Sequence, residues 1–131
     1  MIPKFRAYYA EKMWYVAKID LWGDPEQTTC DLAPYLPKYD ELFDIPLIET
    51  ALMQSTGLKD ENGVEIFEGD VLYYIPFETH INNSIIVFEK GSFCKKMLRN
   101  GKLTSVKFID SEEYEVIGNV YENPELLEVA E

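Results

Sequence analysis

The fold follows from the stretch Ile85-Ile86-Val87-Phe88-Glu89-Lys90-Gly91-Ser92-Phe93-Cys94-Lys95-Lys96-Met97-Leu98. Two strand-like runs flank the Lys90-Gly91 step, and a glycine at such a corner permits the tight turn of a β-hairpin. Asn100-Gly101 marks a second hairpin turn, after which residues 102–109 run back along the sheet. The stretch therefore predicts three consecutive antiparallel strands.

The residues before this stretch show the same pattern, in which short strand-like runs are separated by tight turns. Asn62-Gly63 and Gly69 mark two corners, and Val71–Ile75 is a strongly apolar strand that Pro76 closes. Short strands at regular spacing with glycine corners are typical of a small barrel. We therefore expect a strongly bent, barrel-like antiparallel sheet over residues 57–131.

The C-terminal segment carries two further local signals. The strand-like run Tyr114–Tyr121 has Gly118 near its centre, which predicts a β-bulge or a close approach of two backbones. Asn123 and Pro124 are typical of the cap and first position of a helix. A short helical turn is therefore expected at residues 123–127.

The N-terminal third predicts a β-hairpin followed by a loop. Residues 13–22 alternate between two faces, and Phe5–Tyr9 is the expected partner strand across a short turn near Glu11. Residues 24–46 contain four prolines, three of them after residue 33, which forbid a central strand there. The sequence thus predicts an elaborated surface loop over residues 24–46, in which Thr28–Leu32 could pair briefly with another strand. Residues 47–54 look strand-like again, and Thr56-Gly57 is expected to end that strand.

The length of 131 residues fits a single domain. We expect one all-β domain, residues 1–131, with a hairpin lobe and proline-rich loop at 1–56 and the barrel at 57–131. The apolar runs are far shorter than the roughly 20 residues that cross a bilayer, and the N-terminus lacks the apolar core of a secretory signal. The sequence therefore predicts a soluble, cytoplasmic protein with no membrane association.

Charge is unevenly distributed along the chain. The formal net charge is −12, yet residues 90–107 carry six basic residues and no acidic one. This basic island has two interpretations, a patch that contacts phosphates or a partner, or solvated strands whose lysines offset nearby carboxylates. The candidate interaction patch within it comprises Lys95, Lys96, Arg99 and Lys102. A second copy of the chain could also place its acidic surface against this patch.

The sequence contains no strong catalytic motif. His80 is the single histidine, and its pairing with Cys94 is a minor hypothesis beside a solvated loop histidine. Asp60, Asn62 and Glu65 faintly resemble a calcium loop without its full ligand set. We therefore expect no catalytic, metal or cofactor residues, and two reduced cysteines, Cys30 and Cys94.

Three segments resemble the YopX family of small bacteriophage and prophage proteins. They are the opening residues 1–7, the run 52–71 from Leu52 to Val71, and the closing run 116–127 from Val116 to Leu127. The resemblance spans nearly the whole chain and implies a β-rich fold, a phage origin and a cytoplasmic location. It implies no activity and no site residues, and the proline-rich segment departs from it.

Three functional hypotheses remain open at this point. The first is a non-enzymatic phage accessory protein that acts through protein–protein contacts and self-associates as a homo-oligomer. The second is an acidic mimic of nucleic acid that inhibits a host enzyme acting on DNA or RNA. The third is a nucleic-acid-binding module that uses the hairpin at residues 90–107; the net charge of −12 disfavours it.

Overall fold

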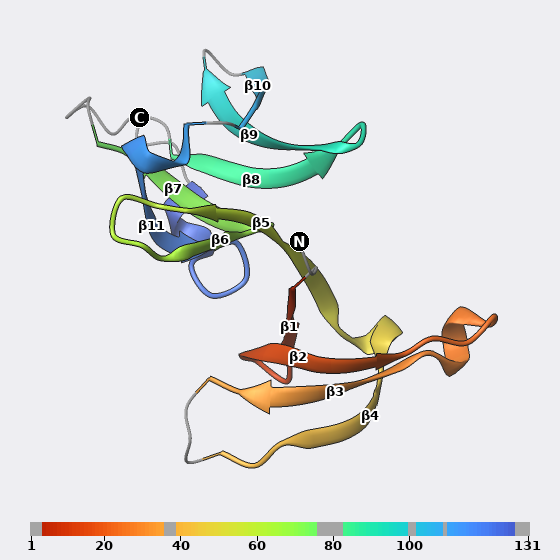
Figure 1. Ribbon diagram of the computed structural model, residues 1–131. Coiled ribbons are helices and arrows are strands. Elements are labelled where there is room, and N and C mark those ends of the chain that lie inside the picture. Colours follow the sequence, from red (N-terminus) through yellow and green to blue (C-terminus); the bar gives the residue numbers. More distant parts are fainter. Residues whose placement is uncertain (1–3, 36–38, 76–82, 100–101, 109, 128–131) are drawn as a thin grey trace. The chain divides into compact units, whose positions relative to one another are not determined.

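The computed structural model describes residues 4–35, 39–75, 83–99, 102–108 and 110–127 (Figure 1). The strands are β1 (Phe5–Tyr9), β2 (Lys12–Asp20), β3 (Thr29–Pro34), β4 (Leu42–Pro46), β5 (Ala51–Lys59), β6 (Glu65–Phe67), β7 (Asp70–Tyr74), β8 (Ser84–Glu89), β9 (Ser92–Arg99), β10 (Lys102–Lys107) and β11 (Tyr114–Asn119). The short 3-10 helices are η1 (Pro25–Gln27), η2 (Leu47–Glu49), η3 (Ser111–Glu113) and η4 (Pro124–Leu127). The prediction of an all-β fold with a short C-terminal helical turn is confirmed.

The strands form two antiparallel sheets. One has the order β4-β3-β2-β1-β5-β6 and the other β10-β9-β8-β7-β11. The chain divides into two compact units, Ile2–Gln54 and Ser55–Glu131, so that β5 contributes its first residues to one unit and the rest to the other.

The N-terminal unit is centred on the predicted hairpin. Ala10 and Glu11 both have positive φ (51° and 63°), the conformation of a two-residue turn whose twist matches that of paired strands. Its core contains Ala7, Trp14 and Leu32, from three neighbouring strands, together with Cys30. The Trp14 indole N–H donates to the Tyr9 carbonyl at 3.0 Å, which satisfies a buried polar group.

The prediction of a surface loop over residues 24–46 is wrong for much of that segment, although the brief pairing allowed at Thr28–Leu32 corresponds to β3. β3 pairs with both β2 and β4, and β4 is the edge strand of its sheet. Pro34 and Pro46 stand at the ends of their strands, where a missing N–H costs little. Asp44 has a φ of 55° and donates its N–H to the Asp31 carboxylate at 3.0 Å. This irregular edge breaks the alternation of apolar residues from which a strand is predicted.

The ends of the proline-rich connection contact their own sheet. The rings of Tyr15 and Tyr35 stack with centroids 3.8 Å apart, and the Lys12 ammonium lies 3.8 Å from the centre of the Tyr39 ring. Both contacts join residues next to positions 36–38 to strand β2. The connection is therefore anchored on the N-terminal unit at each side of those three residues, which lie outside the described ranges.

Two predictions around β5 also differ from the structure. Residues 47–49 form the 3-10 helix η2 in place of a strand. Thr56 and Gly57 do not end β5, which continues to Lys59. Gly57 has a φ of 78°, and the pairing with β6 shifts register between Ser55 and Lys59. The glycine thus bends the strand without ending it, as in a β-bulge.

The core of the C-terminal unit lies between the β5–β6 pair and the five-stranded sheet. Its buried residues are Ile66, Leu72, Ile86, Phe108 and Tyr114. The predicted Lys90-Gly91 turn is confirmed, with φ values of 51° and 82°. The Asn62-Gly63 corner is also present, with Gly63 at a φ of 78°; Asn100-Gly101 lies outside the described residues.

Gly118 confirms the predicted β-bulge, whereas the atoms that approach it most closely belong to side chains and not to another backbone. The pairing of β11 with β7 shifts register between Val116 and Gly118, which is a β-bulge. A Cβ at residue 118 would lie 2.5 Å from the Asn123 side-chain oxygen and 2.8 Å from a methyl group of Leu126. Only a residue without a side chain allows η4 to approach β11 so closely.

Candidate functional site

The candidate interaction patch lies on two neighbouring strands, β9 and β10. Lys95 and Lys96 are consecutive in β9, so their side chains point to opposite faces of the sheet. Arg99 and Lys102 are register partners at the far end of the β9–β10 ladder, and their side chains lie outside the described part of the chain. The structure therefore does not present Lys95 and Lys96 on one common face.

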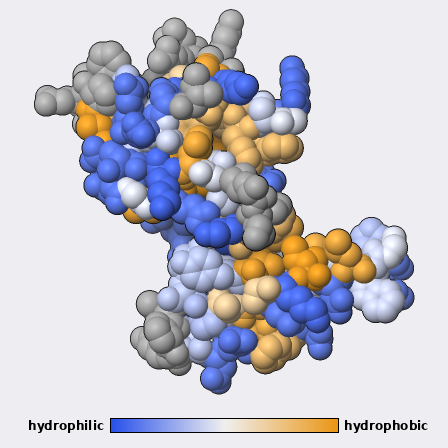
Figure 2. Space-filling model, in the orientation of Figure 1, coloured by the Kyte–Doolittle hydropathy of each residue, from blue (hydrophilic) through white to orange (hydrophobic). Residues whose placement is uncertain are grey.

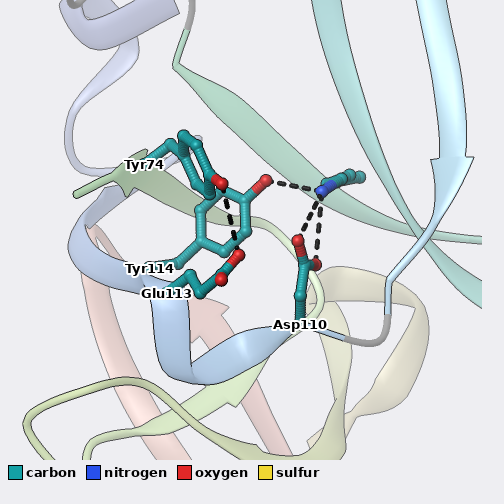
Figure 3. A network of polar contacts seen from close by, with 5 residues as sticks. Tyr74, Asp110, Glu113 and Tyr114 are labelled. Carbon is teal, nitrogen blue, oxygen red and sulfur yellow. Dashed lines mark hydrogen bonds and ion pairs between the residues drawn. The ribbon is translucent and has the colours of Figure 1, made fainter. Parts of the chain in front are cut away.

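Lys95 belongs to a polar network inside the C-terminal unit (Figure 3). Its ammonium lies 3.2 Å from both carboxylate oxygens of Asp110 and donates to the Tyr114 hydroxyl at 2.5 Å. Only 12% of the Lys95 side chain is exposed. Burial alone would lower the pKa of Lys95, but the hydrogen bonds to Tyr114 and Asp110 outweigh it, so the pKa is raised. The charge of Lys95 is thus compensated within the chain.

Tyr74 extends the network toward η3. Its ring centroid lies 5.0 Å from that of Tyr114, and its hydroxyl donates to the Glu113 carboxylate at 3.3 Å (Figure 3). Burial raises the pKa of Tyr74, and the negative charge of Glu113 raises it further. The network therefore joins β7 to η3 and β9 to the start of β11 through polar contacts, and a ring contact joins β7 to β11.

Lys96 forms an ion pair with Glu89 of the neighbouring strand β8. Lys90 and Lys107 are exposed, and neither takes part in the ion pairs found among the described side chains. Of the four island lysines whose side chains the structure describes, Lys95 and Lys96 are thus offset by carboxylates of the same chain, while Lys90 and Lys107 face solvent.

The proposed thiol–imidazole pair falls outside what the structure covers, because His80 is not among the described residues. Cys94 is half-buried, and its thiol donates to the Ser92 carbonyl at 3.8 Å. Cys30 is buried, which raises the pKa of its thiol, and the neighbouring Asp31 charge adds to the effect. Both cysteines are free thiols.

The carboxylates of the run at 52–71 hold backbone in place. Asp60 is buried and accepts hydrogen bonds at 2.9 Å from the N–H groups of Asn62, Val64 and Val116. Asp70, also buried, accepts from the Phe67 N–H at 2.8 Å. Within the described ranges, no group of three or more His, Cys, Asp or Glu side chains is arranged to hold a metal ion.

A cluster of exposed apolar residues was not predicted from the sequence. Leu21, Trp22 and Ile48 are 80%, 59% and 64% exposed, and we call them the apolar tip. Figure 2 shows hydrophobic surface gathered over η2 and the neighbouring end of β2. The signal in the sequence is Leu21-Trp22 directly before the Gly23-Asp24-Pro25 strand stop, where pairing can no longer bury both side chains.

Comparison with known families supports the resemblance. A family model described as YopX protein matches residues 4–128. The chain belongs to the YopX family. The crystal structure of protein EF1440 from Enterococcus faecalis is similar to this YopX protein with 30% identity and a TM-score of 0.57, over 98% of this chain and 99% of that one.

The YopX fold also matches a second solved structure. The crystal structure of protein yopX from Bacillus subtilis shares 23% identity with a TM-score of 0.56, over 95% of this chain and 98% of that one. The search of curated proteins gives no match. In the described parts of this YopX chain, no helix has the length and hydrophobicity needed to cross a membrane.

Proposed function

We propose that this YopX protein is a non-enzymatic accessory protein of a bacteriophage or prophage that acts through protein–protein contacts in the bacterial cytoplasm and self-associates. The apolar tip is the observation that carries the proposal. Three large apolar side chains exposed together, each more than half accessible, are costly in water and typical of a surface that binds another protein.

The polar residues of the family motifs support the same proposal. Asp60 and Asp70 bind backbone N–H groups, and Glu65 accepts a hydrogen bond from Ser55 at 2.5 Å. These side chains are used in building turns and strand junctions. A scaffold whose motif residues support the backbone is suited to presenting a rigid surface to a partner.

Light scattering over a salt series tests the self-association. We expect a mass above that of the 15.2 kDa monomer at low salt, falling as salt screens the opposite charges. A monomer at every salt concentration would contradict self-association. Static scattering coupled to gel filtration measures the mass directly.

The acidic-mimic hypothesis has its own supporting observation. Residues 108–131 contain eight acidic residues and no basic one, and Glu112, Glu113, Glu122 and Glu125 are exposed. A mimic competes with DNA for a DNA-binding protein, so a competition assay with a bacterial nucleoid protein distinguishes this role from self-association.

A further inference from the structure

The apolar tip is held together by one buried residue, Thr28. Its hydroxyl accepts the Trp22 N–H at 3.3 Å, and its carbonyl accepts the Leu47 N–H at 3.0 Å. Leu21-Trp22 and Leu47-Ile48 therefore lie on the two sides of Thr28, the first directly after β2 and the second directly after β4. The tip is thus one local surface of the N-terminal unit, built from segments that are distant in the sequence.

The tip continues the apolar face that forms the core of this unit. Ile19 and Ile45 are both register partners of Cys30, and all three pack in the core. Leu21 stands two positions after Ile19, so the alternation of β2, continued by one residue, places Leu21 on the same face. Leu47 stands two positions after Ile45 and also packs against the core, whereas Leu21 is 80% exposed. The apolar face therefore extends beyond the part that the unit itself buries.

Hydrogen bonds within η1 and η2 fix the backbone around this surface. Asp24 accepts the Glu26 N–H through its carboxylate at 3.0 Å, and the Leu47 carbonyl accepts both the N–H and the hydroxyl of Thr50. The two short helices also contact each other. A preformed surface loses little conformational entropy on binding, which favours association.

The charge beside the tip is uniformly negative. The segments 20–28 and 46–50 contain no basic residue. Lys18, which precedes them, is the register partner of Asp31 and by alternation lies on the opposite face of the sheet from Leu21. The acidic residues of the two segments are all exposed: Asp20, Asp24, Glu26 and Glu49. A partner that covers the tip is therefore favoured if it carries cationic groups around its apolar residues.

We propose that the apolar tip binds a basic amphipathic segment of a partner protein. Apolar side chains of that segment cover Leu21, Trp22 and Ile48, and its lysine or arginine side chains face the acidic residues beside them. The same negative charge disfavours the tip of a second copy and an anionic lipid surface as occupants. This inference rests on the proposed function, because it names the chemistry of the partner in those protein–protein contacts.

Trp22 provides the readout for a binding experiment. It is 59% exposed, whereas Trp14, the other tryptophan of the chain, is 5% exposed. The probe is a synthetic amphipathic helix of leucine and lysine, about 18 residues long and free of tryptophan. We expect it to shift the emission of the wild-type protein to shorter wavelength by removing Trp22 from water, and to bind more weakly as salt rises. The same peptide with glutamate in place of lysine should cause no shift.

Two tip variants separate the apolar part of the contact from the charged part. Leu21→Ser with Ile48→Ser removes apolar side chains and keeps Trp22 as the reporter. Glu26→Lys with Glu49→Lys reverses charge beside the tip and leaves its apolar residues in place. Each variant should raise the dissociation constant of the lysine peptide on the order of tenfold or more.

Two matched control variants change the C-terminal unit in the same way. Glu112→Lys with Glu125→Lys makes the same change of net charge at exposed residues, and Val64→Ser with Ile117→Ser removes exposed apolar side chains. Both should bind the lysine peptide within about threefold of wild type, since neither alters the tip. Circular dichroism verifies the fold of every variant.

The opposite results separate this inference from the proposed function. If the lysine peptide causes no shift, or the tip variants bind it as tightly as wild type does, the inference is wrong, and light scattering still tests self-association independently. If the glutamate peptide binds equally well, the tip has no preference for a basic partner, and only the proposed protein contact stands. A shift caused by phosphatidylglycerol vesicles and by neither peptide would make the tip a lipid contact and contradict both.

Discussion

The Asp60 carboxylate lies in the interior of the C-terminal unit and joins two elements. One oxygen accepts two N–H groups of the turn at residues 62–64, and the other accepts the Val116 N–H of β11. Asp60→Asn would replace one acceptor by a donor, so that at least one of these N–H groups would lose its partner inside the unit. We expect the free energy of unfolding to fall by about 2 kcal/mol or more, measured by urea denaturation.

Glu61→Gln provides the control for this prediction. Its side chain is exposed, and only its backbone N–H takes part in the contact with β11, donating to the Tyr114 carbonyl at 3.0 Å. The free energy of unfolding should therefore change by less than about 0.5 kcal/mol. Equal losses in the two variants would show that the Asp60 hydrogen bonds add little to stability.

The Lys95 network predicts that stability falls at alkaline pH. The pKa values of Lys95 and Tyr74 are both raised above their ordinary values of 10.5 and 10.0. A group whose pKa is raised on folding contributes stability that is present below the unfolded pKa and lost as pH rises through the folded one. Urea denaturation should show the free energy of unfolding declining above about pH 10.

A double variant, Lys95→Met with Tyr74→Phe, isolates this network. It removes both titrating groups, so its unfolding free energy should decline less steeply than that of wild type over the same alkaline range. Parallel declines in the two proteins would assign the alkaline loss to other groups.

At the scale of elements, the bulge in β11 depends on the absence of a side chain at Gly118. Gly118→Ala would place a Cβ 2.5 Å from the Asn123 oxygen, which accepts the Asn119 N–H at 3.3 Å. Asn123 must then move and give up this hydrogen bond. We expect unfolding to require about 1–2 kcal/mol less free energy, as measured by urea denaturation.

Gly23→Ala is the matched control for the bulge prediction. A Cβ at Gly23 meets no atom within 4 Å. Its free energy of unfolding should stay within about 0.5 kcal/mol of wild type. A comparable loss at both glycines would mean that chain flexibility, and not packing against η4, sets the cost.

Turn chemistry and alternation predict much of the fold because they act locally. The Lys90-Gly91 turn, the β1–β2 hairpin and the Gly118 bulge all follow from neighbouring residues. β4 and the continuation of β5 through Gly57 do not, because each depends on pairing with a distant strand through an irregular register. Irregular registers remove the period-2 signal on which strand prediction depends.

The candidate site was less predictable for a related reason. The basic island is visible in the sequence, but its ion-pair partners are not. Strand register brings Glu89 to Lys96, and the position of η3 brings Asp110 to Lys95. The apolar tip joins residues 21–22 to residue 48 through Thr28. Neither arrangement has a local pattern from which it could be inferred.

At the scale of the whole molecule, acidic charge extends over both units. The segment 2–54 contains nine acidic and five basic residues, and the segment 55–131 contains fifteen and seven. Neither unit is therefore basic, although residues 90–107 are. Two of the lysines there are already paired within the chain, so long-range repulsion opposes the approach of nucleic acid.

We accordingly expect no complex with duplex or single-stranded oligonucleotides at about 0.15 M salt in a gel-shift assay, because nucleic-acid binding requires several uncompensated phosphate contacts. Lys107→Glu is the informative variant, since Lys107 is exposed, whereas reversing Lys95 would disrupt its network with Asp110. A shift at this salt that Lys107→Glu abolishes would instead place a nucleic-acid site on β10 around Lys107.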